Sequence, residues 1–420
     1  MTRATPAAAT GDAPVTVATI DAAAALTAGV VRETPVLSTR TLSDQAGFTV
    51  VLKAENLQRT GSFKLRGATA KIASLDPQEC VRGVVCGSAG NHAQAVAYAA
   101  RARGAPCEVF MPEQAPIAKV EAATALGATV RMIGSSVDEA LGAARERAID
   151  AGMQFIHPFD DPQVIAGQGT IGLELRAQVP QLARVVVPVG GGGLISGIAI
   201  AVKSVLPDVE VIGVQVETCA SFGPSLAAGA PVPVASLRPT IADGIAVKRP
   251  GDLTLALIAT WVDRLVTVSE DAVSEAMVSL LERAKLVVEG AGAVGVAALQ
   301  AGLIEPAGDG ATAVVLSGGN VDAGLLAEVA RRSETQSGRR LVLATVLPDR
   351  PGSLVQLLSL VASSGANLLD VQHIREGLDL HIRETAVQLV IETRGRAHAR
   401  TVTDTVRAAG YLEPGPMSAA

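Results

Sequence analysis

Short runs of valine and isoleucine alternate with helical patterns over about residues 50–335 of the chain. Apolar and polar side chains do not alternate within these runs, as expected for strands that are buried on both faces. The runs lie at 50–54, 83–87, 108–111, 128–133, 155–158, 184–190, 210–217 and 312–319. This series predicts parallel strands in a three-layer α/β fold, in which ligands bind where strands end and helices begin.

The pattern changes near residue 333. Residues 333–340, SETQSGRR, are polar and charged and predict a linker. After the linker, three strands are expected, with one helix following the first strand and another following the third. A short last strand is expected near Tyr411. The three strands are predicted at 341–347, 366–374 and 384–393. This βαββαβ order predicts a second, ferredoxin-like domain over 341–420.

Composition and charge narrow the possible classes of protein. Of the 420 residues, 49% are apolar and 18% are charged, which excludes intrinsic disorder. No run reaches the roughly 18 uncharged apolar residues of a membrane span. The net charge of −6, without a basic stripe, argues against a nucleic-acid partner.

The N-terminus and the cysteines predict where the protein works. Residues 1–15 are rich in Ala, Thr and Pro and predict a disordered tail without a secretory signal. The cysteines have no C-x-x-C spacing and predict free thiols in a reducing compartment; they are Cys80, Cys86, Cys107 and Cys219. We therefore expect a cytoplasmic protein.

Two motifs carry candidate chemistry in the first half of the chain. Lys64 lies in GSFKLRGA, a small and apolar segment at a predicted helix start. Desolvation there lowers the pKa of a lysine and lets it form a Schiff base, although an ordinary surface lysine is the alternative. Ser88, Gly90 and Asn91, in CGSAGNHAQA, lie where a strand turns into a helix. Backbone N–H groups at such a turn suit a carboxylate, unless the turn is a simple helix cap.

Two further motifs follow later strands. Residues 190–193 are four consecutive glycines that follow a predicted buried strand and open a helix. Their amides can form a nest around a phosphate, and the spacing matches neither a dinucleotide nor an ATP motif. A phosphate monoester therefore fits best, and a glycine-rich bend is the alternative. In LSGGN, residues 316–320, Ser317 offers a neutral hydroxyl to a ring nitrogen.

With these four motifs, the chain resembles the fold-type II pyridoxal-phosphate (PLP) enzymes over about residues 15–330. Within that class it is similar to the threonine ammonia-lyase (threonine dehydratase) family. The resemblance implies a catalytic domain over 16–332 with two three-layer α/β subdomains, as in the tryptophan synthase β fold. The smaller subdomain would span about 55–160. Lys64 would be the catalytic lysine that forms the Schiff base with PLP.

The resemblance also implies roles for the other site residues. Asn91 would bind the phenolic oxygen of PLP, and Ser317 the pyridine nitrogen. Phe63 and Gly244 resemble the residues that sandwich the ring, and Glu289 resembles an acidic residue near the cofactor. The phosphate would be held by Gly190, Gly191, Gly192, Gly193 and Leu194, and the substrate carboxylate by Ser88, Ala89, Gly90, Asn91 and His92.

The implied reaction is elimination of water from L-threonine, and more slowly from L-serine, with Lys64 taking the α-proton. Ala89 stands where serine racemases of this fold have a second serine, so racemisation should be weak. Glu217 matches a glutamate of a family cation site, but Ser221 and Gly223 follow where a carbonyl and an aspartate are expected. We therefore predict no metal.

Other readings of the same motifs stay open. One is a serine or 3-hydroxyaspartate dehydratase or racemase of the same fold, and another is a synthase that replaces the β-group. A third is a non-catalytic amino-acid sensor, against which the intact Lys64 and Asn91 argue.

The C-terminal domain resembles an ACT domain through DRPGSL, residues 349–354. Its turn places backbone amides at a helix start, where they can bind an amino-acid carboxylate; the residues concerned are Asp349, Pro351, Gly352 and Ser353. We expect a branched-chain amino acid to regulate a homo-oligomer, either a dimer or a tetramer. A domain that only mediates oligomerisation is the alternative.

Overall fold

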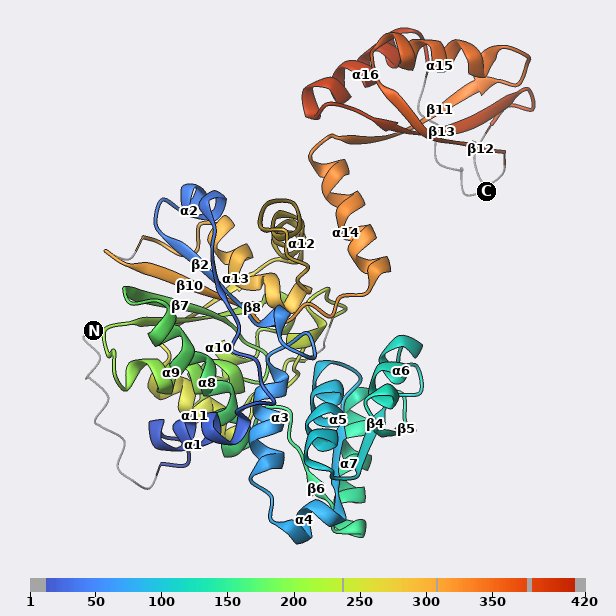
Figure 1. Ribbon diagram of the computed structural model, residues 1–420. Coiled ribbons are helices and arrows are strands. Elements are labelled where there is room, and N and C mark those ends of the chain that lie inside the picture. The colour runs from blue at the N-terminus through green and yellow to red at the C-terminus, as the bar shows by residue number, and fades with distance from the viewer. Residues whose placement is uncertain (1–12, 236–237, 307–308, 376–379, 412–420) are drawn as a thin grey trace. The chain divides into compact units, whose positions relative to one another are not determined.

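The computed structural model describes residues 13–235, 238–306, 309–375 and 380–411 (Figure 1). The chain forms two compact units that divide between Val321 and Asp322. Most of the tail predicted for residues 1–15 lies outside the described residues. The prediction is wrong at Val15, which is buried against Ile20 and Ala23 of helix α1 (Val17–Thr27).

The larger of the two sheets in the first unit has six strands (Figure 1). Its strand order is β1-β2-β10-β7-β8-β9, and every neighbouring pair is parallel except β1 with β2. Four of its strands confirm predicted runs, and the structure adds β1 and β9. The strands are β1 (Val36–Ser38), β2 (Val50–Ala54), β7 (Leu182–Pro188), β8 (Glu210–Val216), β9 (Arg264–Val268) and β10 (Ala311–Leu316).

Helices cover both faces of this sheet. Alternate side chains of a strand point to opposite faces, and those of β7 divide accordingly. Val185 and Val187 join the core that includes helices α8 (Pro162–Gln178) and α9 (Gly193–Lys203). The intervening Val186 lies beside Gly295 of α13 (Gly290–Gln300). The predicted three-layer arrangement is therefore confirmed.

The second, smaller sheet has four parallel strands in the order β5-β4-β3-β6. They are β3 (Val84–Gly87), β4 (Cys107–Met111), β5 (Thr129–Met132) and β6 (Gln154–Phe155). Helices α3 (Lys64–Ala73) and α5 (Asn91–Arg103) pack with Val84 on one face. Helix α7 (Val137–Ala151) packs with Val85 on the other.

Helices α3 and α8 cross with their backbones in contact. A Cβ on Gly167 would lie 2.7 Å from the Cα of Gly67 and 2.6 Å from the carbonyl oxygen of Arg66. A Cβ on Gly67 would lie 2.7 Å from the carbonyl oxygen of Val164. Because atoms cannot approach so closely, only glycine fits at the crossing. The start of α3, at Lys64, is thereby tied to the larger sheet's helical layer.

The second unit contains an antiparallel sheet with the order β11-β13-β12. Leu343 and Leu389 of this sheet pack against two helices through Leu357 and Val402. In chain order the elements are α14 (Ala323–Gln336), β11 (Arg340–Pro348), α15 (Ser353–Ser363), β12 (Asn367–Ile374), β13 (Glu384–Glu392) and α16 (Arg396–Ala408). The predicted βαββα order is present, Tyr411 is not in a strand, and the rest of the predicted last strand lies outside the described residues.

The linker predicted for 333–340 differs from the structure. Residues 333–336 are the last turn of helix α14, and β11 begins at Arg340. Only Val329 of α14 is buried, so the polar face of an exposed helix resembled a linker in the sequence. The boundary between units accordingly lies at 321/322 and not at 332.

The remaining described helices are α2 (Arg40–Ala46), α4 (Pro77–Arg82), α6 (Ile117–Ala125), α10 (Phe222–Ala228), α11 (Asp252–Trp261) and α12 (Glu270–Ser279), with single turns η1 (Glu55–Leu57), η2 (Glu217–Cys219), η3 (Asp243–Ile245) and η4 (Leu280–Ala284). None of the described helices has both the length and the apolar character to cross a membrane.

Candidate active site

Lys64 begins helix α3 beside the end of strand β10. The backbone N–H of Phe63 donates to the carbonyl oxygen of Ser317 at 3.0 Å, and that of Gly319 donates to Gly61 at 2.9 Å. These bonds flank an antiparallel bridge between Ser62 and Gly318. The GSFKLRGA and LSGGN motifs, about 250 residues apart in sequence, therefore lie side by side.

The Lys64 amine is partly buried and faces a carbonyl group. Its Nζ donates to the carbonyl oxygen of Pro158 at 2.8 Å and lies 5.2 Å from the centre of the Phe63 ring. Burial lowers the pKa of Lys64 to about 8, against the opposing effect of the Glu289 charge. About a tenth of the amine is then neutral, and hence nucleophilic, at pH 7.

A hydrogen-bonded chain connects Asn91 with two neighbouring loops. The Asn91 amide donates to Glu289 Oε1 at 2.7 Å, and Asn320 donates to Asn91 Oδ1 at 2.8 Å. Asn320 also donates to the carbonyl oxygen of Thr60 at 2.8 Å. Burial, with a smaller contribution from Asp243, raises the pKa of Glu289 to about 7. Glu289 is therefore poised to hold or release a proton near neutral pH.

Gly244, one of the two residues predicted to sandwich the ring, lies beside Glu289. A Cβ on Gly244, in η3, would lie 3.4 Å from Glu289 Oε1. A Cβ on Gly318 would overlap the same oxygen. Ser317, at the end of β10, is 3% exposed. The structure thus brings Gly244, Glu289, Asn91, Ser317 and Lys64 into one neighbourhood.

The glycine loop joins β7 to α9. Gly192 has φ +91°, and no side chain caps the N-terminus of α9. The first N–H groups of a helix lack partners within that helix, so an uncapped N-terminus suits an anion. Close neighbours leave no room for larger residues, because a Cβ on Gly191 would overlap the Phe159 ring and one on Gly190 would lie 2.9 Å from the Cα of Ile245.

Residues 158–159 connect the glycine loop with Lys64. Pro158 accepts the hydrogen bond of the amine, and the adjacent Phe159 ring packs against Gly191. One group of backbone donors, one amine and one neutral hydroxyl are thus assembled around a common region. These groups match those of PLP. The glycine loop would hold the phosphate, the Lys64 amine would react with the aldehyde, and the Ser317 hydroxyl would meet the ring nitrogen.

The loop predicted to bind the substrate carboxylate opens α5. Ser88, Ala89, Gly90 and Asn91 are partly exposed, and a Cβ added to Gly90 would meet no atom within 4 Å apart from its chain neighbours. Helix α5 has no side-chain cap. His92 differs, because its ring is buried, bonds the carbonyl oxygen of Ile156 at 2.9 Å and has its pKa lowered by burial to about 3. His92 can therefore contribute to the predicted carboxylate site only through its backbone.

The residues at the positions of the family cation site differ in their exposure to solvent. Glu217 and Gly223 are exposed, whereas Ser221 is buried and its hydroxyl has no hydrogen-bond partner. In the part of the chain that the structure describes, no three His, Cys, Asp or Glu side chains are placed to hold a metal ion.

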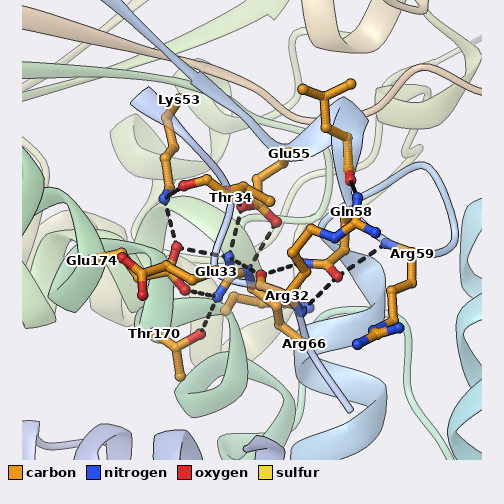
Figure 2. Close-up of polar contacts among 12 residues, drawn as sticks. Arg32, Glu33, Thr34, Lys53, Glu55, Gln58, Arg59, Arg66, Thr170 and Glu174 are labelled. Atoms are coloured by element: carbon orange, nitrogen blue, oxygen red, sulfur yellow. Dashed lines mark hydrogen bonds and ion pairs between the residues drawn. The ribbon is translucent and has the colours of Figure 1, made fainter. Parts of the chain in front are cut away.

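A buried ionic cluster around Arg66, two residues after Lys64 in the sequence, was not predicted (Figure 2). Arg66 pairs with Glu55 at 2.8 Å and with Glu174 at 2.6 Å, and Lys53 pairs with Glu174 at 2.5 Å. Thr34 also donates to Glu55. Burial alone would raise the pKa of Glu55, but the Arg66 guanidinium lowers it. The cluster ties α3 to β2, η1 and α8; its sequence signal was an arginine inside an otherwise apolar helix start.

Asn320 and the segment 158–159 also contribute to the site without having been predicted. Asn320 is the last residue of the LSGGN motif, and its place in that motif is the signal that could have identified it. Pro158 and Phe159 follow a predicted strand, but nothing in their types indicated a contact with an amine or a glycine.

The turn predicted to bind an effector lies between β11 and α15. Gly352 has φ +90°, and α15 begins at the buried Ser353 without a side-chain cap. Asp349 pairs with Arg375 at 2.7 Å, and Arg375 lowers the pKa of Asp349. The uncapped helix start is compatible with the predicted carboxylate site.

Stability should fall as the pH drops below 6.5. Burial lowers the pKa of His92 to about 3 and of His157 to about 4, and raises that of Glu289 to about 7. Between about pH 5 and 6 the unfolded chain binds most of both histidine protons, whereas the folded chain binds essentially only the Glu289 proton. The difference of one proton lowers the free energy of unfolding by about 1.4 kcal/mol per pH unit of acidification. Urea titrations at a series of pH values measure this slope.

Two variants test these pKa shifts, because they should change the slope of stability against pH in opposite directions. His157→Asn, which keeps an acceptor for the N–H groups of Phe159 and Asp160, should flatten the slope to about zero. Glu289→Gln should double it. A slope that neither variant changes would contradict these pKa shifts.

Comparison with known proteins shows the family to which the chain belongs. The family described as "Pyridoxal-phosphate dependent enzyme" matches residues 27–318. The chain belongs to this family, as a fold-type II PLP enzyme of the threonine ammonia-lyase group.

One relative, the L-threonine ammonia-lyase of Thermotoga maritima, is 47% identical over 91% of this chain and 94% of its own. Among solved structures, threonine deaminase isoform 2 from Solanum lycopersicum has a TM-score of 0.72 at 35% identity, over 77% of this chain and 89% of that chain. Maize serine racemase has a TM-score of 0.72 at 34% identity, over 77% of this chain and 99% of that chain.

Proposed function

We propose that the protein is a PLP-dependent lyase that converts L-threonine to 2-oxobutanoate and ammonia, and L-serine more slowly to pyruvate. The observation that carries the proposal is the Lys64 amine, whose pKa is lowered to about 8 in the same neighbourhood as Ser317, Asn91 and Glu289. The relative that is 47% identical bears the corresponding activity in its name.

The residues divide the work between binding and proton transfer. When bound, PLP supplies an electron sink that stabilises negative charge at the substrate α-carbon. Lys64 takes the α-proton, because its lowered pKa leaves a neutral fraction at physiological pH. Backbone amides of residues 88–91 hold the substrate carboxylate, and the glycine loop holds the phosphate. The Ser317 hydroxyl meets the ring nitrogen as a neutral partner.

The experiment is an assay for 2-oxo acid release from purified protein. L-threonine, L-serine, their D-forms and 3-hydroxyaspartate are compared as substrates. We expect the highest kcat/KM for L-threonine. A higher value for L-serine or 3-hydroxyaspartate would transfer the assignment to the corresponding dehydratase, and no 2-oxo acid from any of them would contradict the proposal.

Racemisation should be negligible in the natural protein and detectable in Ala89→Ser. Abstraction from one face needs only Lys64, whereas racemisation needs a second acid on the opposite face, and alanine carries no proton. Ala89 is partly exposed, and an added Cβ on the neighbouring Gly90 would meet no atom within 4 Å. Chiral chromatography of serine after incubation measures the D-isomer. Equal D-serine formation by the two proteins would contradict this role of position 89.

We infer that the second unit is an ACT-type regulatory domain that binds a branched-chain amino acid at the Asp349–Ser353 turn of a homo-oligomer. The uncapped start of α15 and the left-handed Gly352 support this. Isoleucine or valine should change the half-saturating threonine concentration, and Gly352→Val should reduce that response, since a β-branched side chain disfavours φ +90°. An unchanged threonine titration across saturating effectors would leave the unit with a role in oligomerisation alone.

The four described cysteines are free thiols. They support our inference that the protein works in a reducing compartment such as the cytoplasm.

A further inference from the structure

The carbonyl group of Gly191 is held by a side chain from a distant helix. Thr254, in the first turn of α11, is fully buried, and its hydroxyl donates to the Gly191 carbonyl oxygen at 2.8 Å. A trans peptide group is planar, so its N–H points opposite to its C=O. Because the carbonyl of the Gly191–Gly192 peptide faces Thr254, the N–H of Gly192 points away from α11.

The next peptide group is also fixed by a buried hydroxyl. Ser196 donates to the Gly192 carbonyl oxygen through its Oγ at 2.8 Å and its N–H at 3.1 Å. The N–H of Gly193 therefore points out of the N-terminus of α9. A left-handed residue, Gly192, followed by a helical one, Gly193, is the backbone conformation of an anion-binding nest. Two hydroxyls thus set the directions of two successive donors.

Helix α11 is in turn held by the carboxylate of Asp160. Its N-cap, Gly251, has no side chain, and Asp160 instead accepts from the N–H groups of Asp252 at 3.1 Å and Thr254 at 3.0 Å. A Cβ on Gly251 would overlap Asp160. The preceding residue, Phe159, packs against the glycine loop itself. Residues 159–160 therefore support the loop both directly and through Thr254.

We propose that Thr254 is a positioning residue for the phosphate of PLP. It touches neither cofactor nor substrate; it acts by orienting the Gly191–Gly192 peptide so that the Gly192 N–H is preset to donate to the phosphate. The proposal goes beyond the proposed function, since it concerns cofactor binding and holds whichever amino acid is the substrate.

The test compares PLP with pyridoxal, which has the same aldehyde and ring but no phosphate. Full-length protein is freed of cofactor and titrated with each compound by isothermal calorimetry. Thr254→Val removes the hydroxyl at nearly constant volume and should weaken PLP binding about tenfold, as expected for one buried hydrogen bond. It should change pyridoxal binding less than twofold. Thr254→Ser, which keeps the hydroxyl, should bind PLP as the natural protein does.

Two controls separate positioning from a general structural effect. Thr260→Val lies on the same helix, where the Thr260 hydroxyl donates to the Ala256 carbonyl oxygen within α11, and should leave both affinities unchanged. Ser196→Ala removes the second hydroxyl and should again weaken PLP and not pyridoxal, which keeps the proposal testable if Thr254→Val does not fold. The phosphorus NMR shift of bound PLP should move in Thr254→Val and Ser196→Ala only. Equal loss of PLP and pyridoxal affinity, or no loss of either, in the folded variants would overturn the proposal.

Discussion

Replacing Lys64 with alanine should lower 2-oxo acid production from L-threonine by more than about a thousandfold. In the site that we propose, the change removes both the amine that attaches the cofactor and the base that takes the α-proton, and either loss alone costs orders of magnitude. Alanine also fits the start of helix α3, which has no side-chain cap at Phe63 to disturb. Steady-state kinetics and mass spectrometry after borohydride reduction measure the two losses separately.

The matched control is Lys203→Ala. Lys203 ends helix α9, at the opposite end from the glycine loop, and pairs with Asp263 at 2.6 Å. The Lys203→Ala variant should keep its activity and its borohydride-reducible cofactor. A reduced adduct that persists in Lys64→Ala, on any other side chain, would contradict the assignment of the site.

Glu55→Gln, in the buried cluster shown in Figure 2, should have the second large effect, which is a loss of stability. The cluster holds two cations, Lys53 and Arg66, against two carboxylates, Glu55 and Glu174. Neutralising Glu55 leaves one cationic charge uncompensated in the interior. Removing one partner of such a pair costs about 3–5 kcal/mol, and urea denaturation should show a loss of this size in the free energy of unfolding.

A double variant tests whether charge balance is the cause. Lys53→Met combined with Glu55→Gln leaves Arg66 and Glu174 as a balanced pair. The double variant should therefore lose less stability than the sum of the two single variants, a sign of coupling. Arg131, an exposed partner of Glu108, supplies the control, because Arg131→Gln should cost at most about 1 kcal/mol. Strict additivity in the double variant would contradict the charge argument.

The sequence indicated those parts of the fold that depend on local pattern. Buried parallel strands such as β7 and β10 are continuous apolar runs, and their ends were located within three residues. Strand β1 has only three residues, too few for a recognisable period. Helix α14 was partly mistaken for a linker because its exposed face carries the same residues as a solvated loop.

The site was predictable where one residue type is required by chemistry or by space. Lys64, Asn91 and the four glycines are of this kind. The contacts that orient them were not, because Pro158, Asp160 and Thr254 act through carbonyl groups, carboxylates and hydroxyls that many sequences contain. Their roles arise from three-dimensional proximity, such as the 94 residues that separate Asp160 from Thr254, and no local spacing encodes that.

The contact between Gly67 and Gly167 has a practical consequence for redesign. Where two main chains touch, a methyl group at either position would act as a wedge, and the wedge would displace the first turn of α3 and its lysine with it. Mutant libraries aimed at new substrates should therefore leave Gly67 and Gly167 untouched.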